Sequence, residues 1–253
     1  MQTRRVRFFT FAAHPEKDTM LQFANLLPDL QIKLLNHLRA FITPERWAKF
    51  EQIIGLRTRY MTIVLEDIYQ SHNASAVLRS CDCFGIQDVH IIENINKYQV
   101  NPDVALGSSK WLTLEKYNKS DNNTADCLDH LKKCGYGIYC TTPHENDHTP
   151  ETLPLNQPFA LVFGTELAGL SGKALEMADG FIKIPMVGFT ESLNISVSAA
   201  ILMNRLSSRL RNSDFNWSLQ ETEKTVILIN WVANTIKRSD LIVSDFLLRE
   251  TKN

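Results

Sequence analysis

Short β-forming runs alternate with helical segments between Tyr60 and Ile184. We expect strands at residues 60–65, 89–92, 111–114, 137–141, 159–163 and 181–184. We expect helices at residues 73–84, 124–133 and 173–178. Parallel strands need long crossover connections, usually helical, whereas antiparallel strands can be joined by tight turns. The alternation therefore predicts an α/β fold built on a parallel sheet.

Helical periodicity dominates both ends of the 253-residue chain. Apolar side chains recur at helical spacing in residues 21–59, and Thr43 followed by Pro44 forms a good helix cap and first turn. A polar break then precedes a second apolar helix at residues 222–236. These patterns predict a helical N-terminal extension (1–59), a central domain (60–210) and a C-terminal helical extension (211–253).

The charge balance does not identify a nucleic-acid-binding protein, because the net charge is -1 and such proteins are more often basic. Basic residues nevertheless gather in the first sixty positions and on the helix expected after residue 194. They are Arg4, Arg5, Arg7, Arg46, Lys49, Arg57 and Arg59, and then Arg205, Arg209 and Arg211. These groups could form basic faces, although a solvated helix face also accounts for each of them.

Neither a metal site nor a membrane span is expected. The five cysteines are odd in number and lack C-x-x-C spacing, which argues against zinc sites and disulfide frameworks. His144, Asp147 and His148 have spacing that a metal could use, but they lie in a polar loop and are expected to be solvated. No apolar run could cross a bilayer, and the one near the start is too short for a secretory signal. We therefore expect a cytoplasmic protein.

Three loops follow predicted parallel strands, and the carboxyl ends of such strands are where open α/β sheets bind ligands. The first leads to Asn73 and Arg79. An arginine in so apolar a helix is expected to meet a carboxylate or phosphate, and the alternative is an arginine that snorkels to solvent or is paired internally. The second loop, residues 164–171, contains two glycines that would let backbone amides approach a ligand.

The third loop belongs to the stretch from Ile184 to Met203, which is expected to begin as a strand and end as a helix. Ser192 or Asn194 can cap that helix. Ahead of them lie Pro185, Gly188 and Thr190, which continue regular structure poorly. This arrangement suits a helix N-terminus that holds a ligand.

Together the three loops resemble motifs of the SPOUT superfamily of RNA methyltransferases, at the level of the TrmH type. The matching segments, in order, are residues 73–85, 163–171 and 184–200. The resemblance covers roughly Thr43 to the C-terminus. It implies an α/β fold whose C-terminal part is tied in a deep trefoil knot, a homodimer, and S-adenosyl-L-methionine as the methyl donor.

The resemblance also implies roles for individual residues. Those expected to serve catalysis are Arg79, Asn73, Glu166, Ser192 and Asn194. Those expected to bind S-adenosylmethionine are Thr141, Gly164, Ile184, Met186, Leu193 and Ser198. Family members are held to use the arginine matching Arg79 on the ribose hydroxyl, as a base or as an activator. A guanidinium loses its proton only with a pKa above about 12, so we prefer a phosphate-binding role that lowers the pKa of the hydroxyl.

The RNA substrate is less sharply indicated. Family members methylate a guanosine in the tRNA D-loop, ribosomal RNA, or the tRNA wobble position. Residues 107–112 and the flanking helices look like the tRNA guanosine 18 branch. A ribosomal RNA enzyme of the same type is the alternative, and a knotted RNA-binding protein without activity is a third reading. A further hypothesis is that Arg4, Arg5 and Arg7 bind tRNA phosphates electrostatically.

Overall fold

The computed structural model describes residues 23–99, 102–105, 107–142, 145, 147–166 and 168–251. Arg4, Arg5, Arg7 and His144 lie outside the described residues. The chain divides into two compact units, one of Met1–Ile54 with Gln220–Asn253 and the other of Gly55–Leu219. The predicted three-part division at residues 59 and 210 stays a prediction.

The first unit joins the two ends of the chain in one set of packed helices. Its described helices are α2 (Pro28–Arg39), α3 (Pro44–Ile54), α9 (Glu221–Ala233) and α10 (Ser239–Glu250). The buried rings of Phe50 and Trp231 meet edge to face at 5.7 Å and link α3 to α9. The hydroxyl of Thr43 accepts a hydrogen bond from the Arg46 amide at 3.3 Å, which confirms the predicted cap of α3.

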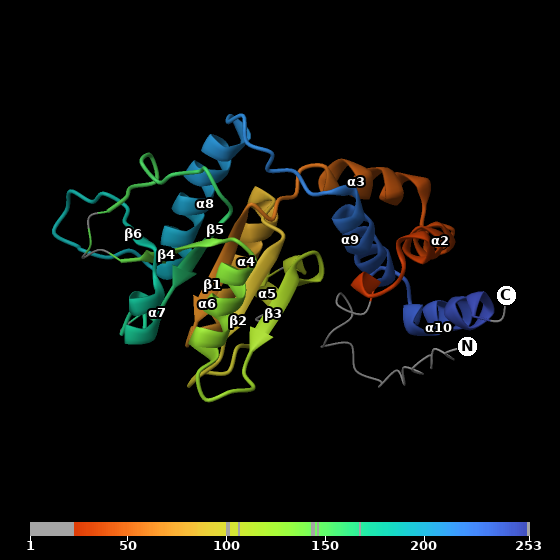
Figure 1. Ribbon diagram of the computed structural model, residues 1–253, viewed down its shortest axis with the longest axis horizontal. Helices are drawn as coiled ribbons and strands as arrows, with labels where there is room; N and C mark the ends of the chain where they lie inside the picture. Colours follow the sequence, from red (N-terminus) through yellow and green to blue (C-terminus); the bar gives the residue numbers. More distant parts are fainter. Residues whose placement is uncertain are drawn as a thin grey trace, which may run out of the picture. The chain divides into compact units, whose positions relative to one another are not determined.

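The second unit is built on a six-stranded sheet (Figure 1). The strands are β1 (Met61–Glu66), β2 (Asp88–Ile92), β3 (Thr113–Tyr117), β4 (Gly137–Thr141), β5 (Phe159–Phe163) and β6 (Gly180–Ile182). Their order is β3-β2-β1-β5-β4-β6, and every neighbouring pair is parallel. The predicted α/β fold with a parallel sheet is therefore confirmed.

Helices cover both faces of this sheet. They are α4 (Ser71–Phe84), α5 (Pro102–Ala105), α6 (Asn123–Lys133), α7 (Gly172–Met177) and α8 (Ile195–Arg211). Successive residues of β1 point to opposite faces. Ile63 shares a hydrophobic cluster with residues of α4 and α8, whereas Val64 shares another with residues of α6 and α7. Helices α4 and α8 thus cover one face, and α6 and α7 cover the other.

Two predicted strand boundaries were wrong for local reasons. The third strand begins at Thr113 instead of Trp111, because a 3-10 turn at Ser108–Lys110 ends at Trp111 and the side-chain amide of Gln87 donates to the Trp111 carbonyl at 3.0 Å. Strand β6 ends at Ile182, so residues 183–194 form an irregular segment without the expected strand start.

Several arginines expected on basic faces are instead structural. Arg57 is buried, pairs with Asp82 and donates to the Ile86 carbonyl at 3.2 Å. Arg209 donates to two backbone carbonyls in the segment 150–153. Arg211 donates to the carbonyls of Leu56 and Phe84, and burial lowers its pKa. Of the set on α8, Arg205 alone is exposed.

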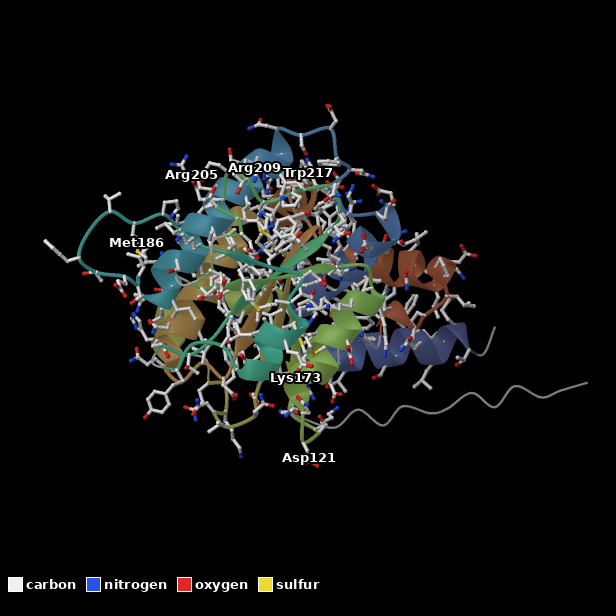
Figure 2. All side chains as sticks on the ribbon, turned by 60° about the vertical axis from the view of Figure 1, so that its left-hand side comes forward. Asp121, Lys173, Met186, Arg205, Arg209 and Trp217 are labelled. Atoms are coloured by element: carbon white, nitrogen blue, oxygen red, sulfur yellow. The ribbon has the colours of Figure 1, made fainter. Side chains whose placement is uncertain are left out.

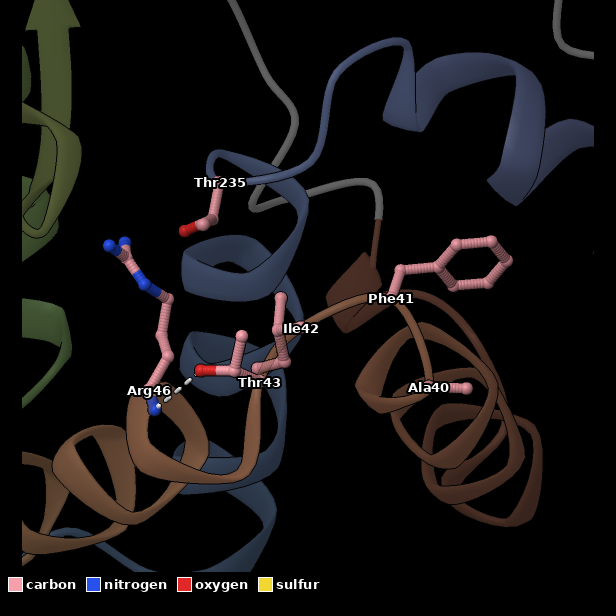
Figure 3. Close-up of a pocket in the computed structure, with 6 residues that line it drawn as sticks. All are labelled: Ala40, Phe41, Ile42, Thr43, Arg46 and Thr235. Atoms are coloured by element: carbon pink, nitrogen blue, oxygen red, sulfur yellow. Dashed lines mark hydrogen bonds between the residues drawn. The ribbon is translucent and has the colours of Figure 1, made fainter.

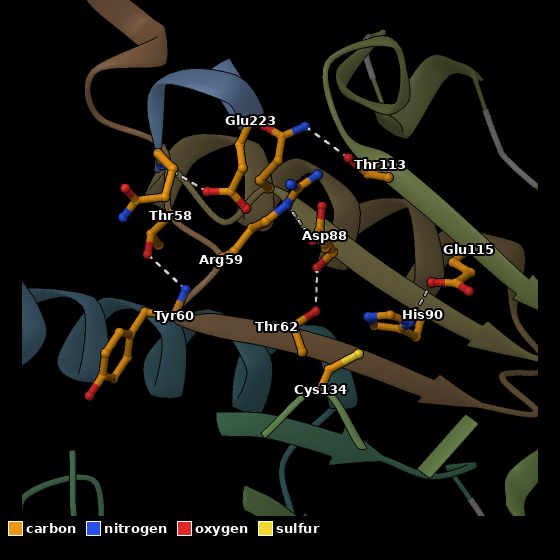
Figure 4. Close-up of polar contacts among 12 residues, drawn as sticks. Thr58, Arg59, Tyr60, Thr62, Asp88, His90, Thr113, Glu115, Cys134 and Glu223 are labelled. Atoms are coloured by element: carbon orange, nitrogen blue, oxygen red, sulfur yellow. Dashed lines mark hydrogen bonds and ion pairs between the residues drawn. The ribbon is translucent and has the colours of Figure 1, made fainter. Parts of the chain in front are cut away.

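Polar contacts hold β1, β2 and β3 in register (Figure 4). Asp88 binds Arg59 through its carboxylate at 2.8 Å, and its carbonyl accepts from the Thr62 hydroxyl at 2.8 Å. Farther along, His90 Nδ1 lies 3.4 Å from a carboxylate oxygen of Glu115 on β3. Burial lowers the pKa of His90, so this imidazole is neutral at pH 7.

Gly85 ends α4 in a left-handed conformation with φ 76°. A Cβ atom there would lie 2.6 Å from the Leu56 carbonyl oxygen and 2.7 Å from the Arg211 guanidinium. Gly107 has a similar φ of 80°, but a Cβ atom there would meet nothing within 4 Å. The two glycines therefore separate the cost of backbone strain from the cost of close packing.

We predict that Gly85→Ala lowers the free energy of unfolding by about 2–4 kcal/mol, because it adds a steric clash to the left-handed strain of about 1–2 kcal/mol. Gly107→Ala should incur the strain alone. Circular dichroism melting of both variants measures the difference. Equal losses in the two variants would show that the packing against Leu56 and Arg211 is unimportant.

Candidate active site

The switch point of the sheet lies between β1 and β5. These strands are neighbours, yet β1 is followed by α4 on one face and β5 by α7 on the other. The helices that follow these strands therefore lie on opposite faces, and the carboxyl ends of the strands at such a switch point are where open α/β sheets bind ligands. All three loops singled out from the sequence begin at carboxyl ends of strands in this sheet.

A hydrogen-bonded cluster joins the three loops at this point. The Asn73 amide donates to a carboxylate oxygen of Glu166 at 2.6 Å and to the side-chain oxygen of Gln70 at 3.1 Å. The side-chain oxygen of Asn73 accepts from the Asn194 amide at 3.1 Å. Asn194 also caps α8 by accepting from the Ser196 amide at 2.9 Å, as predicted. Asn73, Glu166 and Asn194 are thus brought together, with Asn73 buried at the centre.

The glycine loop after β5 folds back on itself. Thr165 and Gly169 exchange two backbone hydrogen bonds, at 2.9 and 3.1 Å. A Cβ atom on Gly164 would lie 2.3 Å from the Gly169 carbonyl. Gly169 itself has φ 70°, which favours glycine. The expectation that glycines admit a ligand is therefore incomplete, since Gly164 first permits the loop to close on its own backbone.

Glu66, which the sequence patterns did not single out, anchors the same loop from the end of β1. Its side chain is buried and accepts from the Ser171 hydroxyl at 2.6 Å, the Ser171 amide at 2.9 Å and the Thr124 hydroxyl at 2.6 Å. Ser171 in turn caps α7 by accepting from the Ala174 amide. One carboxylate therefore fixes both α6 and the loop 164–171 to β1. The available signal was an acidic residue ending an apolar strand.

Asp67 likewise anchors the loop after β2. It adopts a left-handed conformation with φ 52°, and one carboxylate oxygen accepts from the backbone amides of Asn94, Ile95 and Asn96. The Asn96 side chain donates back to the Asp67 carbonyl at 2.8 Å. The loops after β1 and β2 are consequently held as one rigid edge.

The segment after β6 is the most open part of the site. Ile184 is half-buried against the core, whereas Met186 and Leu193 are 37% and 40% exposed. Figure 2 shows Met186 on this segment, which extends away from the sheet. Ser192 is exposed and is not the helix cap, because Asn194 fills that position. The backbone groups of residues 184–193 make no hydrogen bonds with the described residues.

The remaining predicted residues have plain structural placements. Thr141 ends β4 and donates its hydroxyl hydrogen to the Val162 carbonyl at 2.9 Å. Ser198 lies in the first turn of α8 and is half-buried. Arg79 is exposed, and it makes neither an ion pair nor a hydrogen bond with the part of the chain that the structure describes. The expectation that it meets a carboxylate or is paired internally is wrong, because residue 79 faces away from the buried side of α4.

Other candidate sites offer less chemistry. All five cysteines are free, and burial raises the pKa of Cys140 to about 12. Within the described residues no three His, Cys, Asp or Glu side chains gather as a metal site would require, and no helix is long and apolar enough to span a membrane. Asp147 is exposed, as expected, and its carboxylate also accepts from the Phe181 amide at 3.1 Å.

A hollow in the helical unit is lined by Ala40, Phe41, Ile42, Thr43, Arg46 and Thr235 (Figure 3). Its lining supplies one cation and two hydroxyl groups, with no carboxylate, histidine or glycine loop. Acid–base chemistry therefore has no support among those six side chains. The cluster at the switch point remains the candidate active site.

Comparison with known families matches residues 60–204 to the model described as the SpoU rRNA Methylase family. The chain belongs to the SpoU rRNA methylase family. The match begins at β1 and ends within α8, so it spans the sheet and all three loops of the candidate site.

The chain is also similar to individual relatives. The chain is 44% identical to the tRNA (guanosine(18)-2'-O)-methyltransferase of Borreliella burgdorferi over 85% of this chain and 97% of that protein. It is 33% identical to the enzyme of the same name from Thermus thermophilus, over 64% of this chain and 81% of that one. A solved structure, the TrmH/SpoU tRNA-modifying enzyme of A. aeolicus, aligns with TM-score 0.68 and 26% identity, covering 77% of this chain and 98% of that one.

A further solved structure supports the fold alone. The AdoMet-bound rRNA methyltransferase of Sinorhizobium meliloti aligns with TM-score 0.53 and 19% identity, over 62% of this chain and 59% of that one. The fold of this chain is thus shared with one enzyme named for tRNA and with another named for rRNA.

We predict that Glu66→Ala lowers the free energy of unfolding by about 2–4 kcal/mol, because it leaves the buried hydroxyl of Thr124 and the two donors of Ser171 without their acceptor. Glu176→Ala is the matched control, since Glu176 lies on α7 but pairs with Lys173 at an exposed surface. Urea unfolding measures both variants. A loss for Glu66→Ala as small as that of the control would contradict the anchoring role.

Proposed function

We propose that this SpoU family member is an S-adenosylmethionine-dependent tRNA guanosine 2'-O-methyltransferase that acts at D-loop position 18. The observation that carries the proposal is the junction of Asn73, Glu166 and Asn194 at the switch point of the sheet. Its tRNA substrate is supported by relatives from B. burgdorferi and T. thermophilus, whose names specify guanosine 18 of tRNA.

The loops after β5 and β6 fit S-adenosylmethionine, which supplies the methyl group when it is bound. Residues 184–193 hold backbone donors and acceptors that no described residue uses, and these suit the polar edges of an adenine and a ribose. Met186 and Leu193 add exposed apolar surface that a purine would cover. We assign binding to Gly164, Ile184, Met186 and Leu193, with Thr141 and Ser198 at the ends of the adjoining β4 and α8.

Methyl transfer to a ribose requires an oriented hydroxyl group and a path for its proton. The guanidinium of Arg79 is exposed and makes no hydrogen bond or ion pair with the described residues. It is therefore suited to bind an RNA phosphate next to the ribose that accepts the methyl group. A cation at that place lowers the pKa of the hydroxyl, whose proton then passes to solvent water as the C–O bond forms and the bond from the methyl carbon to sulfur breaks. We therefore assign activation of the hydroxyl to Arg79.

The other proposed catalytic residues act through position. Both amide hydrogens of Asn73 are engaged by Glu166 and Gln70, so Asn73 holds the loops instead of touching Arg79. Glu166 then organises the glycine loop from its other side. Ser192 and Asn194 stand at the end of the open segment, where they would line the acceptor pocket.

Three finer features complete the proposal. A deep trefoil knot would form where the segment after β6 returns the chain to α8, which packs with α4 on one face of the sheet. A homodimer would cover Val187, Phe189 and Val197, which are exposed apolar residues of this region. A cytoplasmic location agrees with five free cysteines.

Ribosomal RNA is the alternative substrate, favoured by the description of the family model. A tritium-transfer assay with unmodified tRNA and with ribosomal RNA fragments separates the two. Transfer to tRNA alone supports the proposal, and transfer to ribosomal RNA alone replaces it. Absence of transfer to either RNA, with intact RNA binding, would indicate an inactive RNA-binding member of the family.

We predict that Gly164→Ala weakens S-adenosylmethionine binding at least tenfold, because its Cβ atom would collide with the Gly169 backbone and open the loop. Gly172→Ala lies nearby on α7, where a Cβ atom meets nothing within 4 Å, and should bind normally. Titration calorimetry measures both affinities. Unchanged binding by Gly164→Ala would remove this loop from the cofactor site.

We predict that Arg79→Ala reduces methyl transfer by about 10²-fold or more, the scale expected for loss of one group that stabilises developing negative charge. Its affinity for S-adenosylmethionine should stay within twofold, because Arg79 is assigned to the RNA side. Arg205→Ala, another exposed arginine of this unit (Figure 2), is the control. Near-normal turnover by Arg79→Ala would overturn its catalytic role.

A further inference from the structure

The loop between β1 and α4 presents an aromatic ring beside the candidate active site. Tyr69 is 75% exposed. It directly precedes Gln70, the N-cap residue of α4, whose side chain accepts a hydrogen bond from Asn73. Two residues earlier, Asp67 is held by its carboxylate and by its own backbone groups. The ring is therefore carried by a fixed backbone while most of its surface faces solvent.

The loops after β2 and β3 continue this edge. Asn118 donates to a carboxylate oxygen of Glu93 at 2.7 Å and so ties the two loops together. Exposed side chains on them are Ile95, which is 87% exposed, and two cations, Lys97 and Lys119. We call Tyr69, Ile95, Lys97 and Lys119 the carboxyl-edge platform.

Two of the acidic groups near the platform, Asp67 and Glu93, are turned inward or engaged, whereas Asp121 in the loop after β3 is exposed. Asp67 accepts three backbone amides, and Glu93 accepts from the Tyr98 amide and from Asn118. Lys116, on β3, points its ammonium group over the Tyr98 ring at 5.2 Å and lies near Glu93. The exposed charged side chains on the described parts of the loops after β2 and β3 are thus two lysines, Lys97 and Lys119, and one carboxylate, Asp121, so that positive charge is in excess.

We propose that the carboxyl-edge platform binds the RNA strand that flanks the methylated nucleotide. Tyr69 stacks on a neighbouring base, and Lys97 and Lys119 contact phosphates of the same strand. Unpaired bases in RNA loops are commonly recognised by stacking on aromatic side chains, and every base offers a face for it. This inference rests on the proposed function, because it takes the switch point as the place where the ribose is held.

A second copy of the chain is the competing occupant of this surface. Lysines are depleted from the cores of protein–protein interfaces, whereas lysines beside an exposed aromatic ring suit a polyanion with stacked bases. Tyr69 also shares its loop with the residue that contacts Asn73, so a bound strand there would continue directly from the site of methylation. The observations therefore favour RNA.

The stacking role is tested by Tyr69→Ala and Tyr69→Phe, assayed with unmodified tRNA. The alanine variant should raise KM and the RNA Kd by about 5- to 150-fold, the range expected for loss of one base–aromatic stack. Its kcat and its affinity for S-adenosylmethionine should change little. The phenylalanine variant keeps the ring and should restore both RNA constants. Equal RNA affinity in the wild type and the alanine variant would overturn the proposal.

The phosphate contacts are tested by the double variant Lys97→Ala/Lys119→Ala. Each lost phosphate contact should reduce the slope of log Kd against log salt concentration by about 0.7–1. Lys133→Ala is the matched control, because this exposed lysine ends α6, away from the carboxyl ends of the strands. A slope unchanged from the wild type would remove the lysines from the RNA contact.

Two further outcomes distinguish RNA binding by the platform from dimerisation and from methyl transfer itself. Sedimentation of Tyr69→Ala should give the same molecular mass as the wild type, and a lower mass would assign the platform to a second copy of the chain. If the wild type methylates no RNA, the proposed function fails. Direct measurement of RNA Kd for Tyr69→Ala still decides the platform in that case, since unchanged affinity rejects it.

Discussion

A buried carboxylate at the end of β1 holds the functional end of the sheet together. Removing Glu66 from water is costly unless its oxygens receive hydrogen bonds, and Ser171 and Thr124 supply three of them. The same bonds attach the glycine loop and α6 to a central strand. The Asn73 cluster lies on the other side of that loop, so its geometry depends on this attachment. The stability of the fold and the position of the candidate site therefore both depend on the hydrogen bonds to Glu66.

Much of the fold followed from local patterning. The runs at residues 137–141 and 159–163 are β-rich and became strands with the predicted bounds, because their side chains are almost entirely buried in a parallel sheet. The cap of α3 by Thr43 and of α8 by Asn194 also followed from short-range chemistry. Strand order could not be predicted from local patterns, because the pairing of β1 with β5 joins residues nearly a hundred positions apart.

The site was predicted unevenly for the same reason. Motif resemblance identified Asn73, Glu166 and Asn194, and the structure places them in one hydrogen-bonded cluster. Pattern alone missed Glu66 and Asp67, because a single acidic residue after a strand is common and its partners are remote in sequence. It also misjudged Arg57, Arg209 and Arg211, which all donate to backbone carbonyls that carry no sequence signal, while Arg57 pairs in addition with the remote Asp82.

The open backbone of residues 184–193 has a consequence for how this surface can change over time. Every amino acid presents the same carbonyl group, and every one except proline the same N–H group. Binding of a ligand that is recognised by main-chain atoms is therefore little affected by most substitutions that preserve the path of the backbone. Outward side chains that are not assigned to the ligand, such as Val187 and Phe189, can then vary, so the segment can keep its ligand while its outer face diverges.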